Sequence, residues 1–169
     1  MVMLRHGIPL VPAELIGYHL GLIVPCEDAS LFWNVKTGEK PLAGYGTRIY
    51  MPEYSPNEMF KKLEIPLRIE YHLIDEFTSV GEVKNYLNQI EVRDGDVLMC
   101  YDWGTLFDSD EHYGHVCVFD RLEGNSARII DPAYRSPRWR IITTEKLFDA
   151  MKAHGPEKSG GFWEIKKES

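Results

Sequence analysis

A series of short β-type segments in the second half of the chain sets the tightest limit on how it folds. Asp94-Gly95 precedes an apolar run at Val97–Tyr101, and two further runs flank a Glu123-Gly124-Asn125 turn. Apolar runs separated by turns of this composition are typical of antiparallel strands. We therefore predict an antiparallel sheet with strands at 97–101, 115–121, 127–131, 139–142 and 162–165.

Capping signals predict helices between and before these strands. Ser55-Pro56-Asn57-Glu58 and Ser79-Val80-Gly81-Glu82 each place a serine three residues before a glutamate, which is the capping-box arrangement. Because helices precede most of the strands, the pattern predicts a single α+β domain spanning residues 1–169. Further helices are predicted at 11–20, 26–35 and 144–154, and a half-buried strand is predicted at 67–74.

Composition excludes several classes of protein. The 169 residues are 44% hydrophobic and carry a net charge of −7, which argues against disorder and against a general nucleic-acid binder. Arg135, Arg138 and Arg140 form one local basic cluster, which we interpret as a solvated turn. No stretch approaches the roughly 18 apolar residues that span a bilayer, and the N-terminus lacks the apolar centre of a signal peptide. The three cysteines lack CxxC spacing, and Cys100 and Cys117 lie in apolar strand-like runs, where a free cysteine is usually a core residue. This usage fits a reducing cytosol, so we expect a cytoplasmic protein, and we expect no membrane insertion.

His115 and Asp131 stand at complementary ends of two predicted strands. Gly114-His115 opens the first strand, and Asp131-Pro132 closes the second. In an antiparallel pair the start of one strand lies beside the end of the next, so the two side chains are expected to be neighbours. An Asp beside a His fixes its tautomer and stabilises the imidazolium, as nucleophilic catalysis requires. A purely structural role at strand ends fits the same spacing.

The order of these elements resembles that of the double-glycine leader peptidases, the bacteriocin-processing domains of the papain-like cysteine peptidase superfamily. The unit from Gly114-His115 to Asp131-Pro132 carries most of the resemblance, and a Gly46-Thr47 loop and the capped helices from Ser55 and Ser79 follow the family order. The resemblance implies a papain-like fold, with a helical front half packed on an antiparallel sheet. It also implies that His115 and Asp131 derive from a catalytic pair.

The nucleophile of that family begins the first helix, in a pattern resembling Cys-Gly-Pro-Ala-Ser-Leu. In one frame, the segment Leu10 to Leu15 matches the Pro, the Ala and the final Leu, and Leu10 then occupies the nucleophile position. In a second frame, Cys26 is followed by Glu27-Asp28-Ala29-Ser30-Leu31 and completes a triad with His115 and Asp131. The acidic pair after Cys26 opposes thiolate formation. The first frame also accounts for both N-terminal helices and is preferred, while the second stays open.

The two frames lead to different functions. With Leu10 in place of the nucleophile, the resemblance implies a stand-alone peptidase-like domain that binds a peptide or small amide ligand without cleaving it. Gly114, Asp102 and Trp103 are expected to line the same cleft, because Tyr101-Asp102-Trp103 ends the strand beside that of His115. With Cys26 as nucleophile, the chain is instead an active thiol peptidase or amide hydrolase.

A metal-assisted reaction is a third reading. The segment from Asp108 to His115 contains three carboxylates and the H-x-x-H pair His112 and His115, which are ordinary ligand types. This segment precedes a strand and is predicted to be irregular, so its two histidines are not expected to converge. We therefore predict no metal ion and no cofactor.

Overall fold

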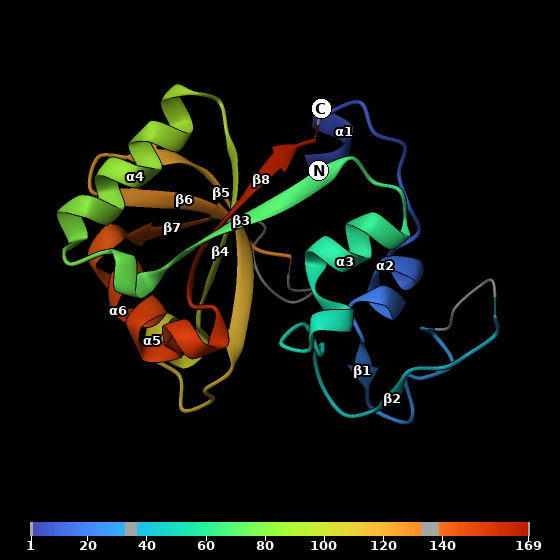
Figure 1. Cartoon of the computed structure of the whole chain (residues 1–169). Coiled ribbons are helices and arrows are strands. Elements are labelled where there is room, and N and C mark those ends of the chain that lie inside the picture. Colours follow the sequence, from blue (N-terminus) through green and yellow to red (C-terminus); the bar gives the residue numbers. More distant parts are fainter. Residues whose placement is uncertain (1, 33–36, 133–138, 169) are drawn as a thin grey trace. The chain divides into compact units, whose positions relative to one another are not determined.

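The computed structural model describes residues 2–32, 37–132 and 139–168 and has an α+β architecture (Figure 1). Contacts within the chain divide it into two compact units. Unit 1 comprises Met1–Arg68 with Lys167–Ser169, and unit 2 comprises Ile69–Lys166. Within the described ranges, none of the helices has the length and apolar character needed to cross a membrane. The α+β class predicted from the sequence is confirmed.

The six-stranded sheet is antiparallel and lies almost entirely in unit 2 (Figure 1). Strand β4 lies inside it, with Met99 paired to Phe162 on one side and to Cys117 on the other. Gly161 permits the close approach of the strand that begins there, since a Cβ at this position would meet the His72 carbonyl oxygen at 2.5 Å. In spatial order the strands are β3 (Leu67–Leu73), β8 (Gly161–Lys167), β4 (Asp96–Asp102), β5 (Gly114–Glu123), β6 (Ser126–Ile130) and β7 (Trp139–Thr143).

Two long helices, α4 (Val80–Val92) and α6 (Thr144–His154), pack on this sheet and close its core. Each begins at a hydroxyl cap, because Ser79 accepts a hydrogen bond from the Glu82 amide and Thr143 accepts one from the Lys146 amide. Apolar side chains at helical spacing face the sheet. The fully buried ones include Val83, Leu87, Ile90, Leu147, Ala150 and Met151.

A β-bulge interrupts the pairing of β5 with β6. Phe119 pairs with Ile129, but Arg121 pairs with Arg128, so β5 contains one residue more than its partner over this stretch. Before the bulge, Cys117 and Phe119 face the buried core. After the bulge, Leu122 packs against the same core. The bulge therefore changes which residues of β5 point inward.

Unit 1 is built from short elements around a smaller core. Strands β1 (Ile23–Val24) and β2 (Leu42–Ala43) pair in parallel over two residues each. Ser55 caps a helix by accepting a hydrogen bond from the Glu58 amide at 3.3 Å, as its capping box predicts. The helical elements are α1 (Val2–Arg5), α2 (Ala13–His19), η1 (Pro52–Tyr54) and α3 (Pro56–Lys62), and the buried apolar residues include Ile8, Leu15, Met59, Phe60 and Ile65.

Most predicted elements are present, with boundaries shifted by one to three residues. The helix predicted from Val11 begins at Ala13, because Pro12 is its N-cap residue. The strands predicted in the second half are all observed, and the last helix has the predicted bounds. Short helices that were not predicted are α5 (Trp103–Phe107), η2 (Ile74–Glu76) and η3 (Pro156–Lys158).

The helix predicted at 26–35 is wrong over its described part. The amide of Asp28 bonds to the Pro25 carbonyl, and that of Leu31 bonds to the Asp28 carbonyl, so both bonds span three residues. These are turn bonds, and α-helical bonds would span four. Residues 33–35 of this prediction lie outside the described residues. The same applies to Arg135 and Arg138 of the predicted basic cluster.

Candidate functional site

The predicted contact between His115 and Asp131 is confirmed. His115 is the second residue of β5, and Asp131 directly follows β6. The Nε2 atom of His115 lies 2.9 Å from Oδ1 of Asp131. The Asp131 side chain has no exposed surface, while 16% of the His115 side chain is exposed. The imidazole therefore borders solvent and the carboxylate lies behind it.

The direction of this hydrogen bond fixes the tautomer of His115. A carboxylate oxygen only accepts, so Nε2 carries the proton and donates it. Nδ1 then holds the lone pair of the neutral ring, and among the described residues it has no hydrogen-bond partner. Trp103 packs edge-on to the His115 ring with centroids 4.9 Å apart, and Tyr113 lies at 6.4 Å. The arrangement presents a hydrogen-bond acceptor between aromatic rings.

Arg140 provides the counter-charge for Asp131. Its Nε atom lies 3.1 Å from Oδ2, the carboxylate oxygen that is not bonded to His115. The guanidinium also stacks over the Phe107 ring at 4.3 Å and over the Trp103 ring at 5.5 Å. Asp131 is thereby held from two sides, by an imidazole on β5 and a guanidinium on β7.

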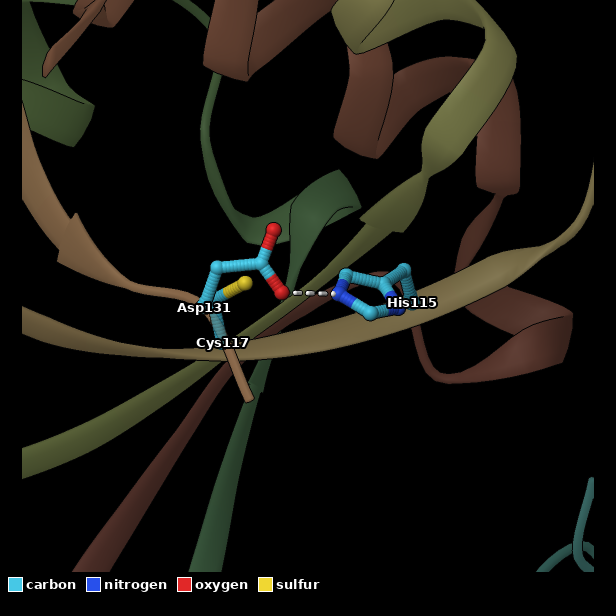
Figure 2. Close-up of side chains that lie close together, drawn as sticks. All are labelled: His115, Cys117 and Asp131. Carbon is cyan, nitrogen blue, oxygen red and sulfur yellow. Dashed lines mark hydrogen bonds and ion pairs between the residues drawn. The ribbon is translucent and has the colours of Figure 1, made fainter. Parts of the chain in front are cut away.

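Cys117 belongs to the same cluster, although the sequence indicated only a core residue. Residues two apart on a strand share a face, so its side chain lies beside that of His115 (Figure 2). One donor atom each from Cys117, His115 and Asp131 fall within 4.8 Å of one another. The thiol is hydrogen bonded to the Tyr101 hydroxyl at 2.8 Å, and its burial raises the pKa of Cys117 to about 12. The period-two spacing of His115 and Cys117 was the signal that would have predicted this contact.

Asp102 does not point at His115 but caps helix α5. Its Oδ1 atom accepts hydrogen bonds from the Thr105 amide at 2.7 Å and the Thr105 hydroxyl at 2.8 Å. His112 donates to the same oxygen through Nδ1 at 2.8 Å. Burial raises the pKa of Asp102, but these hydrogen bonds outweigh that effect and lower it overall. The two histidines of the H-x-x-H pair, His112 and His115, are thus bound to different carboxylates.

Gly114 and Trp103 lie close to His115, as predicted. Gly114 opens β5 opposite Asp102, and a Cβ there would meet the ring of His154 at 2.5 Å. A side chain at this position would therefore displace the His154 ring from the start of β5. Ligand binding by these residues stays a prediction.

Leu10 and Cys26, the two candidate nucleophile positions, belong to unit 1, whereas His115 and Asp131 belong to unit 2. Leu10 is 64% exposed and precedes α2. Cys26 is an exposed free thiol in the turn region after β1. The helix predicted to begin at Cys26 is not formed over its described part, so no helix N-terminus is present there to favour a thiolate.

Unit 1 contains a cavity of about 360 Å³ that the sequence did not indicate. Its walls mix charges of both signs with aromatic rings, and one wall is formed by Arg48, which stacks on Tyr54 at 4.1 Å. Tyr18 and Glu39 also line the cavity, and Tyr18 donates a hydrogen bond to Glu39 at 2.5 Å. None of these residues resembles a catalytic pair, so the chemistry suggested by the sequence lies in unit 2.

Comparison with known proteins does not assign the chain to a family. No family model matches the chain, and no curated protein matches its sequence. The resemblance to double-glycine leader peptidases therefore stays a prediction.

Proposed function

We propose that this chain is a peptidase-like binding domain that recognises a peptide or small amide ligand at His115 and does not cleave it. The observation that carries the proposal is the hydrogen bond from His115 Nε2 to Asp131. It leaves Nδ1 as an acceptor on a partly exposed ring. An amide N–H of a bound ligand is the matching donor.

The surroundings of His115 support an amide ligand. Trp103 and Tyr113 place flat apolar surfaces beside the ring, where they can contact the planar peptide group or a small side chain. Arg140 pairs with Asp131, so the negative charge behind His115 is countered within the protein. A neutral ligand that donates one hydrogen bond fits these features.

The cysteines favour binding over cleavage. Burial raises the pKa of both Cys100 and Cys117 to about 12, so neither thiol is a thiolate at neutral pH. Cys26 lacks a helix N-terminus, and Glu27 and Asp28 follow it directly. Two of the thiols are therefore protonated at neutral pH, and the third lacks the helix end that would favour its thiolate.

We further propose that the α+β architecture of this chain derives from a papain-like cysteine peptidase. Two features support this. Helices precede most of the sheet strands along the chain, and the His and Asp come from neighbouring antiparallel strands in that order. This is the arrangement that the sequence resemblance implies.

Binding can be tested by NMR with protein labelled with ¹⁵N at histidine. The probe is a synthetic ten-residue peptide that ends in Gly-Gly, with EDTA present. We expect the Nδ1 resonance of His115 to shift upfield on saturation, because a lone pair that accepts a hydrogen bond loses its free-base character. The His115→Gln variant should lose binding, while His72→Gln, a half-buried histidine of the same unit, should retain it.

Incubation of the same peptide with the protein, followed by mass spectrometry, tests cleavage. Release of fragments that stops in a Cys26→Ala variant would replace the proposal with an active thiol hydrolase. An unchanged His115 resonance at millimolar peptide would refute binding at this site. Circular dichroism of each variant confirms that it is folded.

A further inference from the structure

Three side chains in unit 2 bring together a nitrogen, a sulfur and an oxygen donor. The donor atoms of His115, Cys117 and Asp131 all lie within 4.8 Å of one another (Figure 2). Two of them come from one face of β5, and the third lies at the end of the neighbouring strand β6. Because the sheet backbone fixes all three, the cluster is held in place before any ligand binds.

We propose that this cluster is a binding site for a thiophilic divalent cation, with Zn²⁺ as the matching ion. Mixed imidazole, thiolate and carboxylate ligation suits Zn²⁺, whereas Mg²⁺ and Ca²⁺ prefer oxygen ligands alone. Tetrahedral Zn²⁺ with bonds of about 2.0–2.3 Å separates neighbouring donors by roughly 3.3–3.8 Å. Small side-chain rotations bring the present donors to that spacing. Three protein ligands leave a fourth position for water.

Two further side chains orient the ligands from behind. Arg140 holds Oδ2 of Asp131 at 3.1 Å, which leaves Oδ1 turned toward His115. The Tyr101 hydroxyl lies 2.8 Å from the Cys117 sulfur. At this distance the phenol can donate a hydrogen bond to a thiolate. Outer partners of this kind are typical of metal sites, where they fix the ligands and tune their basicity.

The proton and charge balance of binding follows from these contacts. Cys117 loses its thiol proton to solvent, and the proton of His115 moves from Nε2 to Nδ1, so one proton is released for each ion bound. Before binding, the carboxylate of Asp131 is balanced by Arg140. After binding, the ion, thiolate, carboxylate and guanidinium sum to one positive charge. The ion itself supplies the electrostatic stabilisation of the thiolate.

This inference goes beyond the proposed function and does not rest on it. The two are nevertheless linked through His115. In the metal-bound state Nδ1 carries the proton, so it donates a hydrogen bond and no longer accepts one. Zn²⁺ is therefore expected to oppose binding of an amide N–H at the same ring.

Absorption spectroscopy with Co²⁺ tests the site directly. The full chain is prepared without a histidine tag in a Cys26→Ala background, which removes the exposed thiol, and is dialysed against EDTA. Addition of Co²⁺ should produce a thiolate-to-cobalt charge-transfer band in the near ultraviolet and visible bands of a tetrahedral ion. One equivalent of Zn²⁺ should abolish these bands by displacement.

Two cysteine variants provide a matched pair. Cys117→Ser should lose the charge-transfer band, whereas Cys100→Ser should keep it, because Cys100 is also a buried thiol but lies outside the cluster. Arg140→Met should keep the band and weaken Co²⁺ affinity by about 10- to 100-fold. If Cys117→Ser does not fold, Cys117→Ala replaces it, with circular dichroism as the check.

The inference is overturned if folded wild-type protein shows no charge-transfer band in a several-fold excess of Co²⁺. It is also overturned if the band survives in Cys117→Ser or disappears only in Cys100→Ser. Because the peptide titration is done in EDTA and the cobalt titration without peptide, failure of one proposal leaves the other measurable.

Discussion

The ion pair between Arg140 and Asp131 offers a quantitative test of how the site is held. Arg140→Met removes the guanidinium and leaves a carboxylate that has no exposed surface. Removing one partner of a fully buried ion pair costs about 3–5 kcal/mol. Because 23% of the Arg140 side chain is exposed, solvent already weakens this pair. We therefore expect Arg140→Met to lower the free energy of unfolding by about 2–3 kcal/mol.

A double-mutant cycle isolates the interaction from other effects of the substitutions. The second single variant is Asp131→Asn, and the double variant should recover most of the loss, because it contains neither charge. We expect a coupling energy of at least about 1.5 kcal/mol. Urea denaturation followed by tryptophan fluorescence is a suitable assay, since three of the four tryptophans, Trp103, Trp139 and Trp163, belong to unit 2.

A matched control comes from an exposed ion pair in the same unit. Lys146 and Asp108 are 38% and 81% exposed, so their cycle with Lys146→Met and Asp108→Asn should give a coupling below about 1 kcal/mol. If the coupling of Arg140 with Asp131 is no larger than that of this control, the reasoning about the buried carboxylate is refuted.

Three other measurements test separate parts of the structure. Ser79→Ala removes the cap of α4 and should lower the free energy of unfolding by about 1 kcal/mol in urea denaturation. Iodoacetamide should label Cys26 in the native protein and leave the two buried cysteines of unit 2 unlabelled until the protein unfolds, as peptide mass spectrometry would show. Burial and the Lys158 cation lower the pKa of His154, so the unfolded state takes up its proton first as the pH falls below about 6.5. Stability should therefore decrease on acidification, and less so in His154→Gln; an identical pH profile for the variant would contradict this assignment.

Local signals explain which parts of the fold could be predicted. The Glu123-Gly124-Asn125 turn fixes the pairing of the strands on either side, and this pairing brings His115 and Asp131 together. Capping boxes likewise located α3 and α4. Each of these features depends on residues close together in the sequence, so no tertiary information was needed.

The missed features depend on contacts between distant segments or on ambiguous local signals. Arg140 reaches Asp131 because β7 pairs with β6. The sequence between these two residues contains no pattern that predicts the contact. The segment after Pro25 has an acidic start typical of a helix, yet it forms turns with three-residue hydrogen bonds. Cys117 was interpreted as a core residue, and it is indeed buried, but burial did not reveal its polar neighbours.

The β-bulge in β5 links the position of His115 to the number of residues in this strand. It adds one residue between Phe119 and Arg121, and so reverses the inward and outward parity of the strand on its two sides. Deleting Asp120 removes the extra residue, and Phe119 and Leu122 then both stay inward by plain alternation, in register with Ile129 and Ala127. A deletion between His115 and Phe119, by contrast, would turn His115 to the opposite face of the sheet. The hairpin is thus expected to tolerate loss of the bulge residue and to lose the site on a deletion closer to His115.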